Sequence, residues 1–214
     1  MNVLITGANR GIGAAMRTQM MGRGDHVIST SRDGSAGYAL DVTDPESQSD
    51  LATKLDSQPL DLLVCNAGIY LDKGQNLADG YGSDLWAATF AANVTGVFLT
   101  IQSLLPNLQI PDTAKIAIIG SQMASHTNAP GGSYIYRASK AAVLNLGRNL
   151  ASDLSGLGIA VGVYHPGWVQ TDMGGGTADI DATQSAQGLL ERFDNLSLAN
   201  TGCFQTWDGR DHVY

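Results

Sequence analysis

Tyr136 and Lys140 stand four residues apart in Tyr136-Arg137-Ala138-Ser139-Lys140, within a segment that has the pattern of a helix. Residues at this spacing project from the same helical face, so an ammonium lies beside a phenol. A free phenol titrates near ~10, and a neighbouring cation favours the phenolate and lowers that pKa. The pair is therefore a candidate for proton transfer at neutral pH. A surface tyrosine packed on a lysine stem would have the same spacing, so the rest of the sequence must decide between the two.

A glycine-rich turn near the N-terminus has the pattern of a dinucleotide-binding turn. Val3-Leu4-Ile5 predicts a buried strand, which runs into Thr6-Gly7-Ala8-Asn9-Arg10-Gly11-Ile12-Gly13 and a helix from Gly11 to about Met21. Strand, glycine-rich turn and helix together let backbone N–H groups approach a pyrophosphate, and glycine is needed where a Cβ would block that approach. The Gly-x3-Gly-x-Gly spacing differs from the commonest dinucleotide fingerprint, so an ordinary strand–helix turn remains an alternative.

The composition excludes several classes of protein. At 214 residues the chain suits one α/β domain with a sizeable core. Its 12 basic and 20 acidic residues give a net charge of −8, which argues against nucleic acid and anionic membranes as partners. Cys65 and Cys203 are too few for a disulfide framework, and neither the cysteines nor the histidines have metal-ligand spacing.

The chain is expected to be cytoplasmic. Its first strand starts at residue 3, which leaves no room for a signal peptide. No uninterrupted apolar run approaches the ~18 residues of a membrane span.

Apolar runs alternate with helical segments along the chain. The expected strands span residues 3–5, 25–31, 37–40, 60–65, 115–119, 159–164 and 201–206. The expected helices span residues 11–21, 45–55, 84–105 and 133–154. Continuous apolar strands separated by helices predict a parallel sheet covered on both faces, and we expect one α/β domain over residues 1–214. The glycine-rich stretch at about residues 173–183 is interpreted as a mobile loop.

Seven motifs in order carry a family resemblance. They are Thr6-Gly7-x3-Gly11-Ile12-Gly13, Asp41-Val42, Asn66-Ala67-Gly68, Asn93-Val94-Thr95-Gly96, Ser121, Tyr136-x3-Lys140, and Pro166-Gly167 with Thr171. The chain resembles the short-chain dehydrogenase/reductase superfamily over essentially its whole length. Residues 136–142 and 166–175 resemble its C-factor/sniffer branch of carbonyl-reductase-like proteins. The resemblance implies a Rossmann-type doubly wound sheet of about seven strands in the order 3-2-1-4-5-6-7.

The same resemblance implies hydride transfer between a nicotinamide and a carbonyl or alcohol substrate. Tyr136 would act as general acid and base, and Lys140 would lower its pKa and bind the nicotinamide ribose. Ser121 would hold the substrate oxygen, and Asn93 would support a water that links Lys140 to solvent. Each residue also has an ordinary alternative role: Asn93, for example, could satisfy backbone groups in a helix kink.

The cofactor is expected to be NADP(H), with NAD(H) as an alternative. Enzymes that prefer NAD place a carboxylate at the end of the second strand, where this chain has Ser31 followed by Arg32. Arg10 and Arg32 would favour a 2′-phosphate through charge-assisted bonds. The alternative is that Arg32 is solvated and Asp33 reaches the ribose. The candidate cofactor residues are Thr6, Gly7, Asn9, Arg10, Gly11, Ile12, Gly13, Ser31, Arg32, Asp41, Val42, Asn66, Ala67, Gly68, Tyr136, Lys140, Pro166, Gly167, Val169 and Thr171.

Three questions remain open at the level of sequence. Ser125 is nearer to Tyr136 than Ser121 and is an alternative catalytic serine, although Ser121 directly follows an apolar strand. The loop after Thr171 is expected to cover the substrate, in a pocket lined by Met123, Tyr134, Trp168 and Met173. The family resemblance also implies a dimer or tetramer, because in that family the two long helices pair across a two-fold axis. The alternative function is a dinucleotide-binding signalling protein with little turnover.

Overall fold

Seven parallel strands form one sheet in the order β3-β2-β1-β4-β5-β6-β7, which confirms the predicted order. The structure is a computed structural model and describes residues 1–214. The strands are β1 (Asn2–Ile5), β2 (His26–Ser31), β3 (Tyr38–Ala39), β4 (Leu62–Cys65), β5 (Ala114–Ile119), β6 (Ile159–His165) and β7 (Phe204–Thr206). Strands β4 and β6 are buried along their whole length, because helices cover both faces of the sheet.

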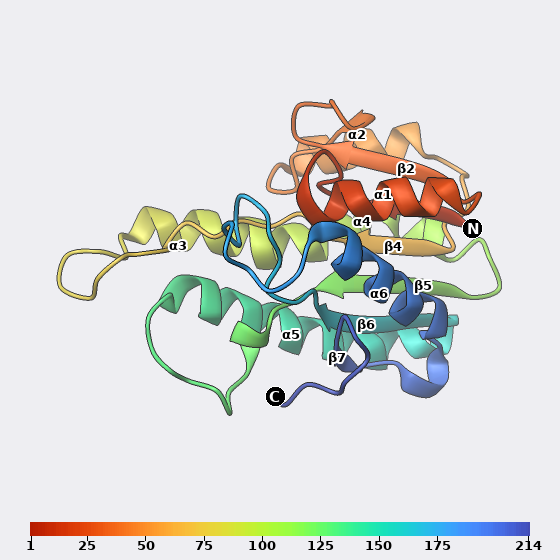
Figure 1. Cartoon of the computed structure of the whole chain (residues 1–214). Helices are drawn as coiled ribbons and strands as arrows, with labels where there is room; N and C mark the ends of the chain where they lie inside the picture. Colours follow the sequence, from red (N-terminus) through yellow and green to blue (C-terminus); the bar gives the residue numbers. More distant parts are fainter.

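Helices cover the two faces in two groups. One face carries α1 (Gly11–Gly22) and α6 (Ala182–Asn195), which lie side by side (Figure 1). The other carries α2 (Pro45–Lys54), α4 (Gly96–Leu108) and α5 (Tyr134–Leu154). Each group closes one of the two hydrophobic cores. The fold is therefore the predicted doubly wound, single-domain α/β fold.

Helix α6 was not predicted, and two of its residues fall in the stretch interpreted as a mobile loop. The loop ends at Asp181, whose carboxylate accepts a hydrogen bond from the Gln184 backbone N–H and caps the helix. Residues 182 and 183 are therefore helical. The apolar stripe was present in the sequence: Ala186, Leu189 and Phe193 are fully buried, at helical spacing.

The helix expected over residues 84–105 contains a π turn. The helical segment is continuous from Ser83 to Leu108, and consists of α3 (Ser83–Phe90), the π turn η1 (Ala91–Thr95) and α4. By length and composition alone this helix could cross a membrane, but a helix that packs in the core of a soluble protein passes the same test. The extra residue of a π turn changes the direction of the side chains, and such turns are common at functional sites. Here η1 contains Asn93.

Candidate active site

Tyr136 and Lys140 both lie on the first two turns of α5 and are both buried. The Lys140 Nζ lies 5.6 Å from the centre of the Tyr136 ring. It donates a hydrogen bond of 2.8 Å to the carbonyl oxygen of Ile119, the last residue of β5. The lysine is thus fixed between the tyrosine ring and the carboxyl end of the sheet, where doubly wound folds place their sites.

The expected lowering of the phenol pKa is wrong for this structure. Burial of the hydroxyl raises the pKa of Tyr136 well above its ordinary value, and the Ser121 hydroxyl beside the phenol opposes only part of that rise. Burial also lowers the pKa of Lys140 to about 8. Desolvation is thus the largest cause of both pKa shifts, and Lys140 is not among the causes of the Tyr136 shift. The consequence is a neutral phenol next to a lysine that titrates close to neutral pH.

The geometry favours Ser121 over Ser125 as the serine beside Tyr136. The Ser121 side chain follows β5 directly and lies close enough to influence the phenol pKa. The Ser125 hydroxyl donates to the carbonyl oxygen of Tyr214 and accepts from the backbone N–H groups of Thr127 and Asn128. Ser125 therefore orders the loop after β5 and the C-terminal segment.

Asp72 and Tyr70 hold Tyr136 in place, and neither was predicted. The side chain of Asp72 is fully buried, and its carboxylate accepts hydrogen bonds from the backbone N–H groups of Ile135 at 2.9 Å and Tyr136 at 3.2 Å. The ring of Tyr70 stacks on the ring of Tyr136 with 4.3 Å between centroids, and its hydroxyl bonds to that of Ser133. The N-terminus of α5 is thus capped by a carboxylate from the loop after β4.

Asn93 ties the π turn to two neighbouring segments. Its side-chain amide exchanges two hydrogen bonds of 2.9 Å with the backbone of Ile69, and its Nδ2 donates to the Ser139 hydroxyl at 3.0 Å. Asn93 Oδ1 and Lys140 Nζ both border Gly68, where an added Cβ would lie 3.2 Å and 3.8 Å from them. The amide therefore has the structural role weighed above, and it also lies close to the lysine.

The glycine-rich turn fits a dinucleotide pyrophosphate. Gly7 and Gly11 have φ angles of +65° and +53°, which favour glycine. A Cβ on Gly13 would lie 2.3 Å from the Gly7 carbonyl oxygen. Helix α1 begins at Gly11, and no side chain caps its N-terminus, so its first N–H groups remain available to an anion.

The turn is joined to the next strand along the sheet by Thr6 and Asn66. The Asn66 Nδ2 donates to the carbonyl oxygens of Thr6 and Gly7, at 2.9 Å and 3.0 Å. The Thr6 hydroxyl in turn accepts from the backbone N–H groups of Asn66 and Ala67. The sheet order reverses between β1 and β4, so this cradle lies at the topological switch point.

The residues expected to select the cofactor lie at the ends of β2 and β3. Ser31 ends β2 and donates a hydrogen bond to Asp33, whose pKa is lowered to about 2 by hydrogen bonds from Ser35 and Ser31. Arg32 is exposed. The pKa of Asp41 is lowered mainly by hydrogen bonds from Thr43, and the charge of Arg32 makes a smaller contribution in the same direction.

Arg10 forms an ion pair with Asp172 at 2.7 Å. Both side chains are largely exposed, so this ion pair contributes little to stability and can exchange for another anion.

The segment after β6 covers the glycine-rich turn and Tyr136. The Thr171 methyl group lies close to Gly11, and a Cβ added to Gly11 would be 3.2 Å from it. The Met173 sulfur lies 4.0 Å from the Tyr136 hydroxyl, and the Trp168 indole donates to the Gly174 carbonyl oxygen at 2.9 Å. Met173 thus borders the reaction centre, and Trp168 contacts the loop that covers it.

The other two expected pocket residues are placed differently. Tyr134 packs edge-on against Tyr81 at 5.1 Å. Met123 lies in the short 3-10 turn after Ser121, and its backbone N–H donates to the Ser121 hydroxyl, which caps that turn. No group of three His, Cys, Asp or Glu side chains is arranged to hold a metal ion.

A glycine-rich cradle and a Ser–Tyr–Lys group at one edge of a doubly wound sheet occur together in this chain, and a family model for short chain dehydrogenases matches residues 1–181. The chain belongs to the short chain dehydrogenase family. Among relatives, it is 36% identical to the C-signal of Myxococcus xanthus over 161 residues, which cover 75% of this chain and 96% of that protein. It is 35% identical to the 1-hydroxy-2-glutathionyl-2-methyl-3-butene dehydrogenase of Rhodococcus sp., over 97% of this chain and 96% of that enzyme.

Solved structures agree with this assignment. The chain superimposes on the NADPH-bound carbonyl reductase from chicken fatty liver with a TM-score of 0.91 and 29% identity, covering 100% of this chain and 98% of that one. The TM-score with the carbonyl reductase Sniffer of Drosophila melanogaster is also 0.91, with 25% identity and coverage of 100% and 99%. The resemblance to the C-factor/sniffer branch is therefore confirmed, and the chain is an oxidoreductase of this family.

Proposed function

We propose that this short chain dehydrogenase is an NADP(H)-dependent reductase of small carbonyl compounds. The observation that carries the proposal is that Ser121, Tyr136 and Lys140 lie together at the carboxyl end of β5. The Ser121 hydroxyl lies close enough to influence the phenol pKa, and the Lys140 amine lies beside the phenol ring. A protein that only bound a dinucleotide would have no chemical need for a buried phenol between a serine hydroxyl and an amine.

Each side chain has a defined task in the proposed reaction. The nicotinamide, when bound, supplies the hydride that the carbonyl carbon receives. Ser121 donates a hydrogen bond to the carbonyl oxygen and orients the substrate. Tyr136 transfers its phenolic proton to the same oxygen as negative charge develops there. The neutral state that burial imposes on Tyr136 is the state that a proton donor requires.

Lys140 returns a proton to Tyr136 after the transfer. Its pKa of about 8 lets it gain and lose a proton near neutral pH. Asn93 Oδ1 borders the same glycine as Lys140 Nζ, and we assign it the support of a water between the lysine and solvent. The Ile119 carbonyl oxygen keeps the amine directed at this position while the charge changes.

The glycine-rich turn and the α1 N-terminus would hold the pyrophosphate, with Thr6 and Asn66 fixing the shape of the turn. Preference for the 2′-phosphate is supported by Ser31 in place of a carboxylate and by two exposed guanidinium groups, Arg10 and Arg32. Asp33 is the competing ribose ligand, and three hydrogen bonds from Ser31 and Ser35 occupy its Oδ1.

A cytoplasmic location and a dimer or tetramer complete the proposal. Large apolar side chains on the long helices support association, since Trp86, Phe98 and Tyr134 are between 37% and 40% exposed. Members of this family act on small molecules, so we propose no nucleic acid or membrane partner.

The test is oxidation of NADPH and of NADH by the purified protein with a panel of aldehydes, ketones and quinones. The proposal predicts NADPH consumption with at least one carbonyl class, and much slower consumption of NADH. Tight NADPH binding without consumption by any compound would contradict it and would favour the signalling alternative.

A further inference from the structure

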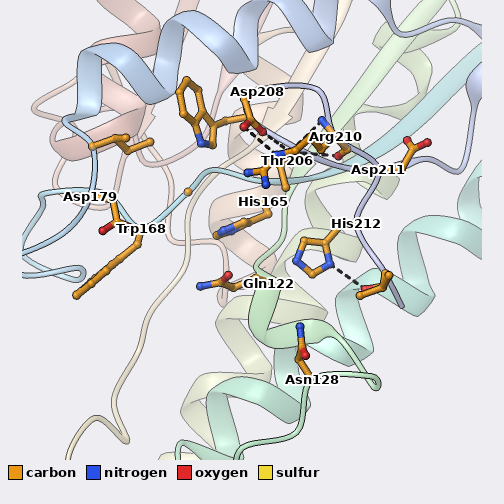
Figure 2. A pocket seen from close by; sticks show the side chains of 14 residues that line it. Gln122, Asn128, His165, Trp168, Asp179, Thr206, Asp208, Arg210, Asp211 and His212 are labelled. Carbon is orange, nitrogen blue, oxygen red and sulfur yellow. Dashed lines mark hydrogen bonds and ion pairs between the residues drawn. The ribbon is translucent and has the colours of Figure 1, made fainter.

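A cavity of about 460 Å³ lies beside the proposed reaction centre and is not used by the mechanism above (Figure 2). It is bounded by Gln122, which follows the catalytic serine, by Trp168, and by the segment that follows β7. Gln122 directly follows Ser121 in the chain, so this end of the cavity lies near the carboxyl end of β5. The cavity extends toward the C-terminal segment, where the part of a substrate remote from its carbonyl would lie.

His165 is a buried titratable residue in the lining of this cavity. It is the last residue of β6, it is 8% exposed, and its Nδ1 is buried without a hydrogen-bond partner. Figure 2 shows its ring between Gln122 and the segment that carries Thr206. The nearest titratable groups are His212, whose ring centre lies 5.9 Å away, and Asp208 and Arg210. Burial lowers the pKa of His165 to about 4, so the imidazole is neutral at physiological pH and adds no positive charge to the cavity.

The charges around the cavity are predominantly negative. Asp179, Asp208 and Asp211 line it, and Arg210 is the only guanidinium. Arg210 is already paired with Asp208 at 2.9 Å, and Asp211 accepts a hydrogen bond only from the uncharged Gln205 amide. Asp179 makes no ion pair or side-chain hydrogen bond and lies beside Trp168 (Figure 2).

Two indole rings add a second attraction for positive charge. Trp168 and Trp207 both line the cavity. Indole faces attract cations, and carboxylates without a partner add to that attraction. An anionic group would meet two unpaired carboxylates and no free cation, so the lining discriminates against it.

We propose that this cavity binds a protonated amine of the substrate, with Asp179 as its counter-ion and the indole rings of Trp168 and Trp207 around it. This inference rests on the proposed function, because it assigns the substrate class of the same site. The substrates would be amino-aldehydes or amino-ketones whose amine lies several bonds away from the carbonyl.

The test uses three aldehydes with the same saturated linker and different ends: dimethylammonium, isopropyl and carboxylate. Isopropyl has the shape of dimethylammonium without its charge and N–H. We expect kcat/KM to be about tenfold higher for the ammonium compound than for the isopropyl compound, with the carboxylate compound lowest. Asp179→Asn should reduce kcat/KM for the ammonium compound about threefold, through KM, and leave the isopropyl compound unchanged.

A matched control variant is Asp153→Asn, which removes one exposed carboxylate from α5, away from the cavity. This variant should leave kcat/KM unchanged for all three aldehydes, because the proposed preference for the ammonium compound comes from Asp179 and not from the overall negative charge of the protein. Equal kcat/KM for the ammonium and isopropyl compounds, or the same effect of both variants, would overturn the amine assignment while leaving the reductase intact. Failure to reduce any of the three, in a protein that binds NADPH, would instead contradict the proposed function.

Discussion

Asp72→Asn tests whether a buried carboxylate from the loop after β4 positions the catalytic tyrosine. The wild-type carboxylate is fully buried, has no cationic partner and uses both oxygens on the first N–H groups of α5. An asparagine has nearly the same volume, but its amide carries one acceptor oxygen instead of two. Either the Ile135 N–H or the Tyr136 N–H would then face an NH₂ group.

The expected cost combines one lost hydrogen bond with the loss of a negative charge at a helix N-terminus. Together these are about 1–3 kcal/mol of unfolding free energy. Because one of the two bonds is made by the backbone of Tyr136, we expect kcat to fall about tenfold as the phenol loses its fixed position. The KM for NADPH should not change, since Asp72 makes no contact with the glycine-rich turn.

The pH dependence distinguishes a positioning role from a purely structural one. The pKa of Tyr136 is raised first by burial, and the charges of Tyr70 and Asp72 raise it further. Removing the Asp72 charge therefore lowers the pKa of the phenol. The pH profile of alcohol oxidation, in which the phenolate accepts the proton, should move toward lower pH.

The control is Asp181→Asn, which makes the same change at the N-terminus of α6, remote from Tyr136 in the fold. It should reduce the midpoint of urea unfolding without altering kcat or the pH profile. If Asp72→Asn behaves in the same way as this control, the carboxylate only caps a helix and the reasoning is refuted.

Three further changes test the cofactor cradle, its selectivity and the buried lysine. Gly13→Ala places a Cβ 2.3 Å from a carbonyl oxygen and should abolish measurable NADPH binding by calorimetry, whereas Gly22→Ala, where the Cβ meets open space, should bind normally. Arg32→Ala should lower the ratio of kcat/KM for NADPH to that for NADH about tenfold, and an unchanged ratio would remove this arginine from cofactor selection. For Lys140 the folded pKa of about 8 is below the ordinary lysine pKa of 10.5, so the unfolded state binds more protons between these pH values. The free energy of unfolding therefore rises with pH across that window. Lys140→Met should therefore be about 1–3 kcal/mol more stable at pH 7 in urea unfolding, with the advantage shrinking toward pH 10, and a pH-independent difference would contradict the buried cation.

The sequence was sufficient for those parts of the site that depend on local pattern. The apolar runs predicted all seven strands, and Gly7, Gly11 and Gly13 marked the cradle because a close backbone approach requires glycine at those positions. The spacing of Tyr136 and Lys140 placed both on one helix, where the structure has them. Each of these features is set within a few residues of chain.

The parts that were missed depend on contacts distant in sequence or on desolvation. Asp72 meets the start of α5 across 63 residues of chain, and no local periodicity marks it. The upward pKa shift of Tyr136 arises from burial by several segments, which a spacing argument does not count. Helix α6 is different, because its Asp181 cap and its apolar stripe were visible in the sequence, but the cap was interpreted as part of a loop and the stripe was not assigned to a helix.

The most direct test of the account compares Tyr136→Phe with the wild-type protein in two measurements on one preparation: NADPH binding by calorimetry and turnover of the best carbonyl substrate. The phenylalanine keeps the stacked ring against Tyr70 and removes only the proton donor. The account predicts that turnover falls about a thousandfold or more, with the NADPH dissociation constant within about threefold of wild type. Wild-type turnover in this variant would contradict the assignment of Tyr136 as the general acid.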